Sequence, residues 1–332
     1  MLVNDLGGSV SGDGSSTRAA DQVVDIIRSA GGEAAPSYAS VVDGEKVVQD
    51  ALTAFGRIDI VINNAGILRD GSFQKMSDKQ WDLVLAVHLQ GAFAVTKAAW
   101  PYMRKQRYGR VIFVCSSTGL YGNFGQANYG AAKMGTLGLA HTLALEGRRR
   151  GILVNTVAPI AASRMTEGLM PPGLMRALSP EAVAPVVAVL AHDQCPCDDA
   201  CVEVGAGWVA AVRWQRSKGE RVPLDQSKDL PAGSGSVEAV AKAWEAAMDF
   251  DVPGASHPSS TQESFEPLLA AMGANRDGGA GSREDEEGMA EGAEEAAMGG
   301  GDSEEEGGSS STAWDSNRDG HPSVGVAREC TK

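Results

Sequence analysis

The fold is decided by residues 58–66, IDIVINNAG, in which an apolar run ends at two asparagines followed by two small residues. The run Ile58–Ile62 has the length and the branched residues of a buried β-strand. Small residues at the carboxyl end of a strand let the backbone approach a ligand, and the amides of Asn64, Ala65 and Gly66 can fix the turn beside it. This stretch therefore predicts a strand followed by a ligand-binding turn.

Short apolar runs alternate with amphipathic stretches on both sides of this strand. The runs and stretches are Leu2–Asn4, Ala19–Ser29, Ala34–Tyr38, Gly44–Phe55, Asp78–Arg104, Val111–Cys115, Gln126–Arg150 and Ile152–Val157. Strands that alternate with helices at this interval form βαβ units with right-handed crossovers. The pattern predicts an α/β fold with a doubly wound, Rossmann-like parallel sheet.

Charge and composition divide the 332 residues into three parts. Residues 1–220 carry the alternating pattern and are predicted to be one α/β domain. Residues 221–272 are predicted to be a linker with a short helix over Val237–Phe250. Residues 273–332 hold 15 acidic and 5 basic side chains and almost no aromatic or branched residues. Such a segment buries too little apolar surface to fold, so we expect a disordered acidic tail.

The remaining charge argues against two kinds of partner. The whole chain has a net charge of -14, but residues 1–272 hold 28 acidic and 24 basic side chains and are nearly balanced. A basic surface for nucleic acid is therefore not expected. No uninterrupted apolar run approaches the ~20 residues that span a bilayer, so no membrane insertion is expected.

Three polar residues have the spacing of a proton-transfer site. Tyr129 and Lys133 are four residues apart in a helical stretch and project from one face of it. A cation beside a phenol favours the phenolate and lowers the pKa of the tyrosine, as a general base near neutrality requires. Ser116 ends the strand Val111–Cys115, where its hydroxyl can bind the same substrate oxygen. The three side chains suit a carbonyl or alcohol substrate.

These motifs together resemble the short-chain dehydrogenase/reductase family. The resemblance rests on Asn63–Gly66, on Ser116, and on the string from Gln126 to Lys133, QANYGAAK. Four further segments resemble the hydroxyacyl-CoA dehydrogenase branch of that family: residues 3–8, 66–70, 121–129 and 203–208. The resemblance implies oxidation of a (3R)-3-hydroxyacyl-CoA to a 3-ketoacyl-CoA with NAD, in peroxisomal fatty acid β-oxidation.

The resemblance also assigns roles to residues. Tyr129 would take the hydroxyl proton, Lys133 would lower its pKa and hold the cofactor ribose, and Ser116 would orient the substrate oxygen. The cofactor-binding residues that it implies, besides Tyr129 and Lys133, are Asp5, Ser40, Val41, Asn64, Ala65, Gly66, Ala161, Ala162, Ser163 and Arg164. The acidic Asp5, after the strand Leu2–Asn4, would accept ribose hydroxyls and repel a 2′-phosphate, which favours NAD over NADP; an ordinary turn aspartate is the alternative.

The sequence departs from the family pattern in places. The family's glycine-rich turn and first strand, a central one, precede the strand at which this sequence begins, so the expected fold lacks both. His88 stands where the family often has an asparagine in a proton relay, and core packing is an equal alternative. His192, Cys195, Cys197 and Cys201 do not have a standard zinc-ligand spacing, so no metal is expected.

Two other functions stay open at this stage. One is a 3-oxoacyl-carrier-protein reductase, which would prefer NADPH; the other is a non-catalytic fragment or interaction protein. The resemblance further implies an acyl-CoA substrate and a homodimer formed through the helix that carries Tyr129. It also implies a peroxisomal location, although the final residues, Cys330–Lys332, do not form a peroxisomal signal; a cytoplasmic location is the alternative.

Overall fold

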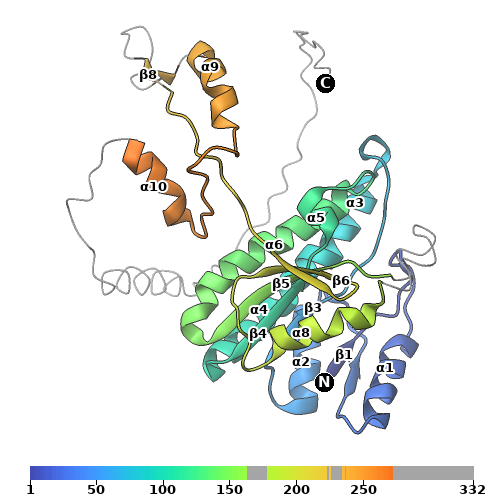
Figure 1. The fold of residues 1–332 in the computed structure, drawn as a ribbon. Coiled ribbons are helices and arrows are strands. Elements are labelled where there is room, and N and C mark those ends of the chain that lie inside the picture. Colours follow the sequence, from blue (N-terminus) through green and yellow to red (C-terminus); the bar gives the residue numbers. More distant parts are fainter. Residues whose placement is uncertain (163–177, 223, 226–233, 236, 272–332) are drawn as a thin grey trace, which may run out of the picture. The chain divides into compact units, whose positions relative to one another are not determined.

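The computed structural model describes residues 1–162, 178–222, 224–225, 234–235 and 237–271. Contacts divide the chain into two compact units, Met1–Ser259 and Ser260–Lys332. The first unit holds the sheets and most helices (Figure 1). The described part of the second is helix α10 (Thr261–Ala271). The predicted tail, residues 273–332, and the candidates Ser163 and Arg164 lie outside the described residues.

Parallel strands confirm the predicted α/β architecture. The strands are β1 (Leu2–Asn4), β2 (Ala35–Ser37), β3 (Ile60–Asn63), β4 (Gly109–Val114), β5 (Ile152–Pro159), β6 (Cys201–Gly205), β7 (Trp208–Val212), β8 (Leu224–Asp225) and β9 (Ser234–Gly235). Strands β3 to β6 are parallel in sequence order, and β7 pairs antiparallel with β6. The pairs β1–β2 (parallel) and β8–β9 (antiparallel) are separate.

The ladder of strand hydrogen bonds is interrupted between β1 and β3, which agrees with the expected sheet that lacks the family's central first strand. Strand β1 pairs with β2, and β3 pairs with β4, but in the described part of the chain no strand pairs with the other edge of β1 or of β3. The sheet is therefore built as two separate ladders.

Most helices follow the predicted stretches, whereas α5 and α8 were not predicted. They are α1 (Arg18–Ser29), α2 (Gly44–Phe55), α3 (Asp78–Leu85), α4 (Gly91–Gln106), α5 (Ser117–Tyr121), α6 (Ala127–Gly147), α8 (Ala184–Ala191) and α9 (Val237–Ala247), with the short turns η1 (Phe73–Lys75), η2 (Ala86–Gln90), η3 (Arg148–Arg150) and η4 (Pro180–Ala182). Polar side chains fix several starts: Asp43 accepts from the Lys46 amide, and Ser77 forms a capping box with Gln80.

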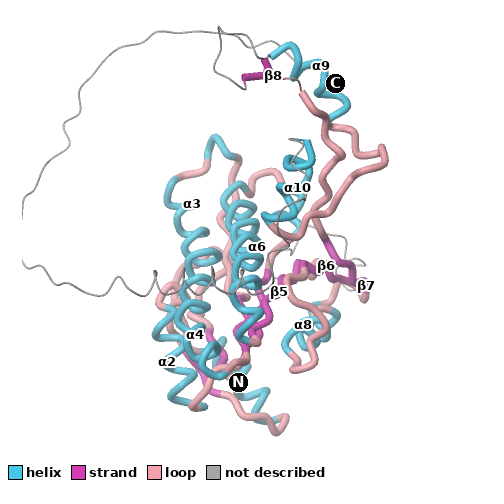
Figure 2. Tube along the Cα trace, turned by 90° about the vertical axis from the view of Figure 1, so that its left-hand side faces the viewer, coloured by secondary structure: helices cyan, strands magenta, loops and turns pink. Residues whose placement is uncertain are grey.

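The core has two layers because successive strand residues face opposite sides. Val61, Phe113 and Val154 belong to one apolar cluster with residues of α2, α4 and α6. Ile112 and Val157, from the alternate positions, pack against α8. Figure 2 shows α2, α4 and α6 on one side of β5 and β6, and α8 on the other.

One long helical stretch passes the length and hydropathy test for a membrane span. Helix α3, the π-helical turn η2 and α4 run without a break from Asp78 to Gln106, and this stretch is long and apolar enough to cross a bilayer. Its Val95 and Ala99 are nevertheless buried in the cluster shared with α2 and β3. We interpret it as a core helix.

Arg110 of β4 is a buried cation held by main-chain oxygens. Its guanidinium donates to the carbonyls of His192 at 3.0 Å and Asp193 at 2.8 Å, and to the carbonyl of Gly109 at 2.8 Å. These bonds join the start of β4 to the segment that follows α8.

Candidate active site

The carboxyl ends of the parallel strands gather most of the predicted site residues. Asp5 follows β1, Ser40 and Val41 follow β2, and the Asn64–Gly66 turn follows β3. Ser116 follows β4, and Ala161 and Ala162 follow β5. The two ladders share this edge, because the Leu68 amide donates to the Val10 carbonyl at 2.9 Å and Arg69 pairs with Asp13 at 2.6 Å.

Ser116 begins helix α5. Its backbone is extended, and its Oγ accepts a hydrogen bond from the Thr118 amide at 3.2 Å. The hydroxyl also lies close enough to Tyr129 to favour the phenolate and lower the pKa of that phenol. The structure therefore brings Ser116 and Tyr129 together as the sequence predicted.

Tyr129 lies in the first turn of α6 and is held by its neighbour. Asn128, which is fully buried, accepts from the Tyr129 amide at 2.8 Å and donates to the carbonyls of Arg69 at 3.0 Å and Gln80 at 3.2 Å. The start of α6 is thereby fixed to the segment after β3. This contact fixes the backbone of Tyr129.

The predicted lowering of the Tyr129 pKa by Lys133 is wrong for this structure. Burial raises the pKa of Tyr129 above its usual value of 10.0, and the nearby Ser116 hydroxyl offsets this only in part. Lys133 lies beside the phenol as expected, with Nζ 5.5 Å from the ring centroid. That Nζ, however, donates to the Val114 carbonyl at 2.6 Å. Helical spacing predicted the proximity but not the direction of the ammonium.

Burial also governs the charge of Lys133. The side chain is buried between α6 and β4, and desolvation lowers the pKa of Lys133 from 10.5 to about 8. The lysine is therefore mostly an ammonium at pH 7 and loses its proton a little above that pH.

His88 lies against Tyr129. It belongs to the π-helical turn η2, and its ring meets the Tyr129 ring edge to face at 5.0 Å. Nε2 lies 3.0 Å from the Ile67 amide nitrogen and 2.8 Å from the Ile67 oxygen, while Nδ1 has no partner in the described part of the chain. Burial, with the charge of Lys133, lowers the pKa of His88 to about 3, so the ring is neutral. The two interpretations of His88, relay and packing, both remain compatible with this placement.

Gly66 is required by the same contact. A Cβ added there would lie 2.4 Å from Cε1 of His88, so only glycine lets the turn after β3 approach the ring. Gly66, which the sequence predicted to leave room for a ligand, also leaves room for the His88 ring.

The other cofactor candidates occupy main-chain turns. The exposed Asp5 accepts from the Gly7 amide at 2.6 Å through one carboxylate oxygen. The Ser40 carbonyl accepts from the Asp43 amide at 2.9 Å, and Val41 packs its side chain on the core. The Asn64 amide donates to the Ile62 carbonyl at 3.1 Å, and the Ala162 amide to Leu178 at 2.6 Å.

Several residues around the site were quoted as motif letters without a role. Gln126 donates to Asp70 at 2.8 Å and accepts from Thr118 at 2.9 Å, which joins the loop before α6 to the segment after β3. Tyr121 donates to the buried Glu203 of β6 at 2.7 Å. Spacing alone does not signal such contacts, because the partners are 56 and 82 residues apart.

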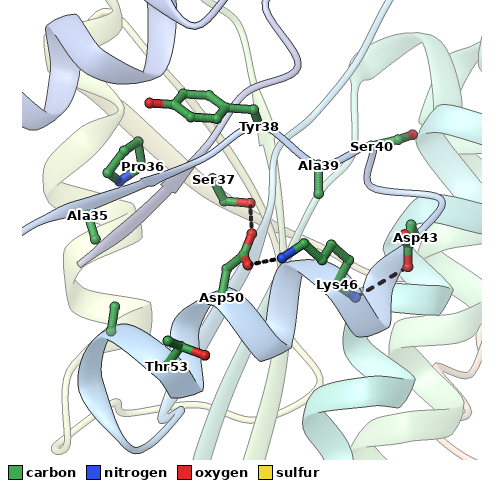
Figure 3. A pocket seen from close by; sticks show the side chains of 11 residues that line it. Ala35, Pro36, Ser37, Tyr38, Ala39, Ser40, Asp43, Lys46, Asp50 and Thr53 are labelled. Carbon is green, nitrogen blue, oxygen red and sulfur yellow. Dashed lines mark hydrogen bonds and ion pairs between the residues drawn. The ribbon is translucent and has the colours of Figure 1, made fainter.

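A cavity of about 630 Å³ lies beside β2 and α2 (Figure 3), and its lining does not include Ser116, Tyr129 or Lys133. An ion pair between Lys46 and Asp50, at 2.6 Å, and a hydrogen bond from Ser37 to Asp50, at 2.8 Å, cross its floor. Of the predicted site residues, it includes only Ser40. We therefore place the active site at the strand ends rather than here.

The cysteine-rich segment offers no metal centre among the described residues, because no group of three or more His, Cys, Asp or Glu side chains is suitably placed. Cys195 donates to the Cys197 carbonyl at 3.2 Å. Burial raises the pKa of Cys197 to about 11, which keeps it a thiol.

The sequence is similar to those of known dehydrogenases. A model of the family described as short chain dehydrogenase matches residues 9–170. A putative short-chain type dehydrogenase/reductase of Mycobacterium tuberculosis is 51% identical over 215 residues, which are 64% of this chain and 75% of that protein. The peroxisomal hydratase-dehydrogenase-epimerase of Neurospora crassa is 50% identical over 254 residues, 76% of this chain and 28% of that protein.

A solved structure shows the same fold. The full-length peroxisomal multifunctional enzyme type 2 of Drosophila melanogaster superposes with a TM-score of 0.68 and 40% identity, over 84% of this chain and 50% of that one. The chain spans between about a quarter and three-fifths of the length of the curated multifunctional relatives that it matches. Fold, site and relatives agree that the chain belongs to the short-chain dehydrogenase family.

Proposed function

We propose that the chain is an NAD-dependent dehydrogenase that oxidises (3R)-3-hydroxyacyl-CoA to 3-ketoacyl-CoA in fatty acid β-oxidation. The observation that carries the proposal is the placement of Ser116 and Lys133 beside the Tyr129 phenol. Relatives named as peroxisomal multifunctional enzymes and as a hydratase-dehydrogenase-epimerase support this substrate class.

The residues at the strand ends fit a nicotinamide cofactor, which the family generally uses. Asp5 exposes its carboxylate after β1, and one of its oxygens already accepts from Gly7, which fixes its orientation. A carboxylate there accepts ribose hydroxyls and repels a 2′-phosphate, so we propose NAD rather than NADP. Asn64, Ala65 and Gly66 would contribute the turn beside it.

Residues of this chain would accept the proton of the substrate hydroxyl. Ser116 Oγ orients the substrate hydroxyl, and the Tyr129 phenolate accepts the hydroxyl proton. When bound, the nicotinamide supplies the acceptor for the hydride that leaves the carbinol carbon. Lys133, whose Nζ lies 5.5 Å from the centre of the phenol ring, would hold the cofactor ribose. The neutral His88 ring holds the phenol from the side.

Exposed aromatic side chains beside the site suit an apolar acyl chain. Phe73, Tyr121 and Phe124 are 79%, 67% and 90% exposed. The Gly71 amide donates to the Gly125 carbonyl at 2.8 Å, which joins the segment of Phe73 to that of Phe124. Exposed aromatic groups gathered near catalytic residues are typical of a surface that binds apolar ligands.

The test is the appearance of NADH when the purified protein is mixed with NAD⁺ and a (3R)-3-hydroxyacyl-CoA. Tyr129→Phe should lower kcat by about 10²-fold or more, because it removes the proton acceptor. Tyr102→Phe, an exposed tyrosine on α4, is the matched control and should keep the parent's rate. The parent's rate should rise with pH above 7, since the base must be deprotonated.

The same assay separates the alternatives. NADP⁺ in place of NAD⁺ should give a lower kcat/KM. Faster reduction of a 3-oxoacyl-carrier protein with NADPH would favour the reductase, and equal rates for the parent and Tyr129→Phe would refute the assigned proton acceptor. We further propose a homodimer and a peroxisomal location, which sedimentation and a fluorescent fusion test.

A further inference from the structure

Tyr121 of α5 and Glu203 of β6 form a hydrogen bond that the proposed proton transfer does not use. The Tyr121 hydroxyl donates to Oε2 of Glu203 at 2.7 Å. The tyrosine is 67% exposed, whereas the glutamate is only 7% exposed. A ring that faces solvent therefore reaches inward to a buried carboxylate.

The strands beside Glu203 offer its carboxylate no polar side chain. Glu203 is in register with Ala158 of β5 and with Ala210 of β7, so its two neighbours in the sheet end in methyl groups. In the described part of the chain, Tyr121 is the group that donates to this carboxylate. A buried carboxylate without a donor is costly in free energy, so the phenol is held there. Bonding to Glu203 raises the pKa of Tyr121 above 10.0, which keeps the hydroxyl a donor.

This bond fixes the far end of the helix that Ser116 begins. Ser116 is the N-cap of α5, and its Oγ accepts from the Thr118 amide, so the direction of that hydroxyl follows the direction of the helix. Helix α5 has only five residues, and so short a helix depends on tertiary contacts. Its middle packs on α6, where a Cβ added to Gly119 would lie 2.9 Å from Cβ of Lys133. Its last residue, Tyr121, ties it to the sheet.

We propose that Glu203 is a positioning residue, which fixes α5 through Tyr121 and thereby aims the Ser116 hydroxyl at the substrate oxygen. The inference rests on the proposed function, in which Ser116 orients the substrate hydroxyl. A small displacement of a group that contacts the reacting atoms slows the chemical step more than it weakens binding. Loss of the bond between Tyr121 and Glu203 should therefore lower kcat and leave KM nearly unchanged.

The first test removes the bond from its exposed side. Tyr121→Phe loses the hydroxyl but keeps the aromatic ring, and with it the surface for an acyl chain. With NAD⁺ and a (3R)-3-hydroxyacyl-CoA we expect kcat to fall about tenfold and KM to change less than about twofold. Tyr38→Phe is the matched control, because it removes another tyrosine–carboxylate hydrogen bond, at 2.6 Å from Asp21. This control should keep the parent's kcat.

The second test changes the acceptor. Glu203→Gln keeps a carbonyl oxygen that can accept from Tyr121, so it should retain the parent's kcat, whereas Glu203→Leu has no acceptor and should lower kcat about tenfold. The double variant Tyr121→Phe/Glu203→Leu should be no slower than Tyr121→Phe, because both changes remove the same interaction. Circular dichroism checks folding, and if Glu203→Leu does not fold, Tyr121→Phe and Glu203→Gln decide the matter.

Hydrogen exchange gives a measurement that needs no turnover. The Gly119 and Leu120 amides both donate to the Ser116 carbonyl, and in Tyr121→Phe they should exchange at least about tenfold faster, because α5 opens more often. If the parent were inactive, faster exchange would still support the link from Glu203 to Ser116 while refuting the proposed function. Unchanged exchange, a rise in KM alone, or equal losses of kcat in Tyr121→Phe and Tyr38→Phe would overturn the inference.

Discussion

At the residue scale, contacts that sequence spacing cannot show decide how the site works. The interval between Tyr129 and Lys133 predicted neighbours, and they are neighbours. The direction of the ammonium depends on the Val114 carbonyl, which comes from another element. Likewise the turn at Gly66 was predicted from its own strand, whereas its need for glycine comes from His88, 22 residues away.

Gly66→Ala should destabilise the protein, because the added methyl would lie 2.4 Å from a His88 ring atom. We expect a loss of about 1–3 kcal/mol in the free energy of unfolding, the usual effect of overpacking, measured by urea denaturation. Gly138→Ala on α6, where a Cβ meets nothing within 4 Å, should be neutral or stabilising. Equal effects of the two changes would contradict the assigned contact.

Lys133→Met should change stability in a pH-dependent way. Burial lowers the pKa of Lys133 from 10.5 to about 8. Between pH 8 and 10.5 the unfolded chain binds more protons than the folded chain, so the free energy of unfolding of the parent rises with pH. Below pH 8 the lysine is charged in both states, and the cost of burying that charge is fully present. The gain of the Lys133→Met variant over the parent should therefore be largest at pH 7 and shrink towards pH 10.5, by about 3 kcal/mol in all. Urea denaturation at pH 7, 8 and 9.5 checks this, and a pH-independent difference would contradict it.

At the element scale, hydrophobic periodicity predicted where helices and strands lie better than it predicted which strands pair with one another. The strand Leu2–Asn4 and the helix Gly44–Phe55 have the predicted bounds. The antiparallel pairing of β7 was not predicted. It depends on the tight turn at Ala206 and Gly207, both at positive φ. Apolar runs show that a strand is present, but the direction of pairing is set by the turn.

Asn128→Ala tests whether the start of α6 positions the tyrosine. The change removes three hydrogen bonds, two of which reach the carbonyls of Arg69 and Gln80. We expect a loss of about 1–3 kcal/mol in stability. We also expect a lower kcat with KM little changed, since the phenol would be less well oriented. Asn123→Ala, an exposed residue of the preceding loop, is the control. Unaltered kcat in Asn128→Ala would show that the contact is structural only.

At the scale of the whole molecule, the β1–β2 ladder and the β3–β7 ladder differ in strand pairing and in burial. Strand β4 is paired on both sides and buries Ile112 and Phe113 completely, while β1 is paired on one side and its three residues are half-buried. The sequence predicted the α/β class from the order of its elements. The apolar runs alone could not reveal the interruption, because each run looks the same whether one or both of its edges are paired. The family resemblance did indicate it, since it implied a sheet without its central first strand.

This inequality predicts an order of hydrogen exchange. In the protein alone, amides of β4 and β5 should exchange at least about 100-fold more slowly than those of β1 and β2, because local opening of a one-sided pair breaks fewer contacts. Mass spectrometry of peptic fragments measures the difference. Uniform protection over both ladders would show that the molecule opens as one cooperative unit.

Arg110 carries a consequence for the order of synthesis on the ribosome. Two of its main-chain acceptors lie 82 and 83 residues further along the polypeptide. Until His192 and Asp193 have been synthesised, the guanidinium of Arg110 lacks these two carbonyl acceptors and stays hydrated. The start of β4 therefore cannot dehydrate when it is made, and final compaction of this side of the sheet waits until the residues beyond α8 have left the exit tunnel.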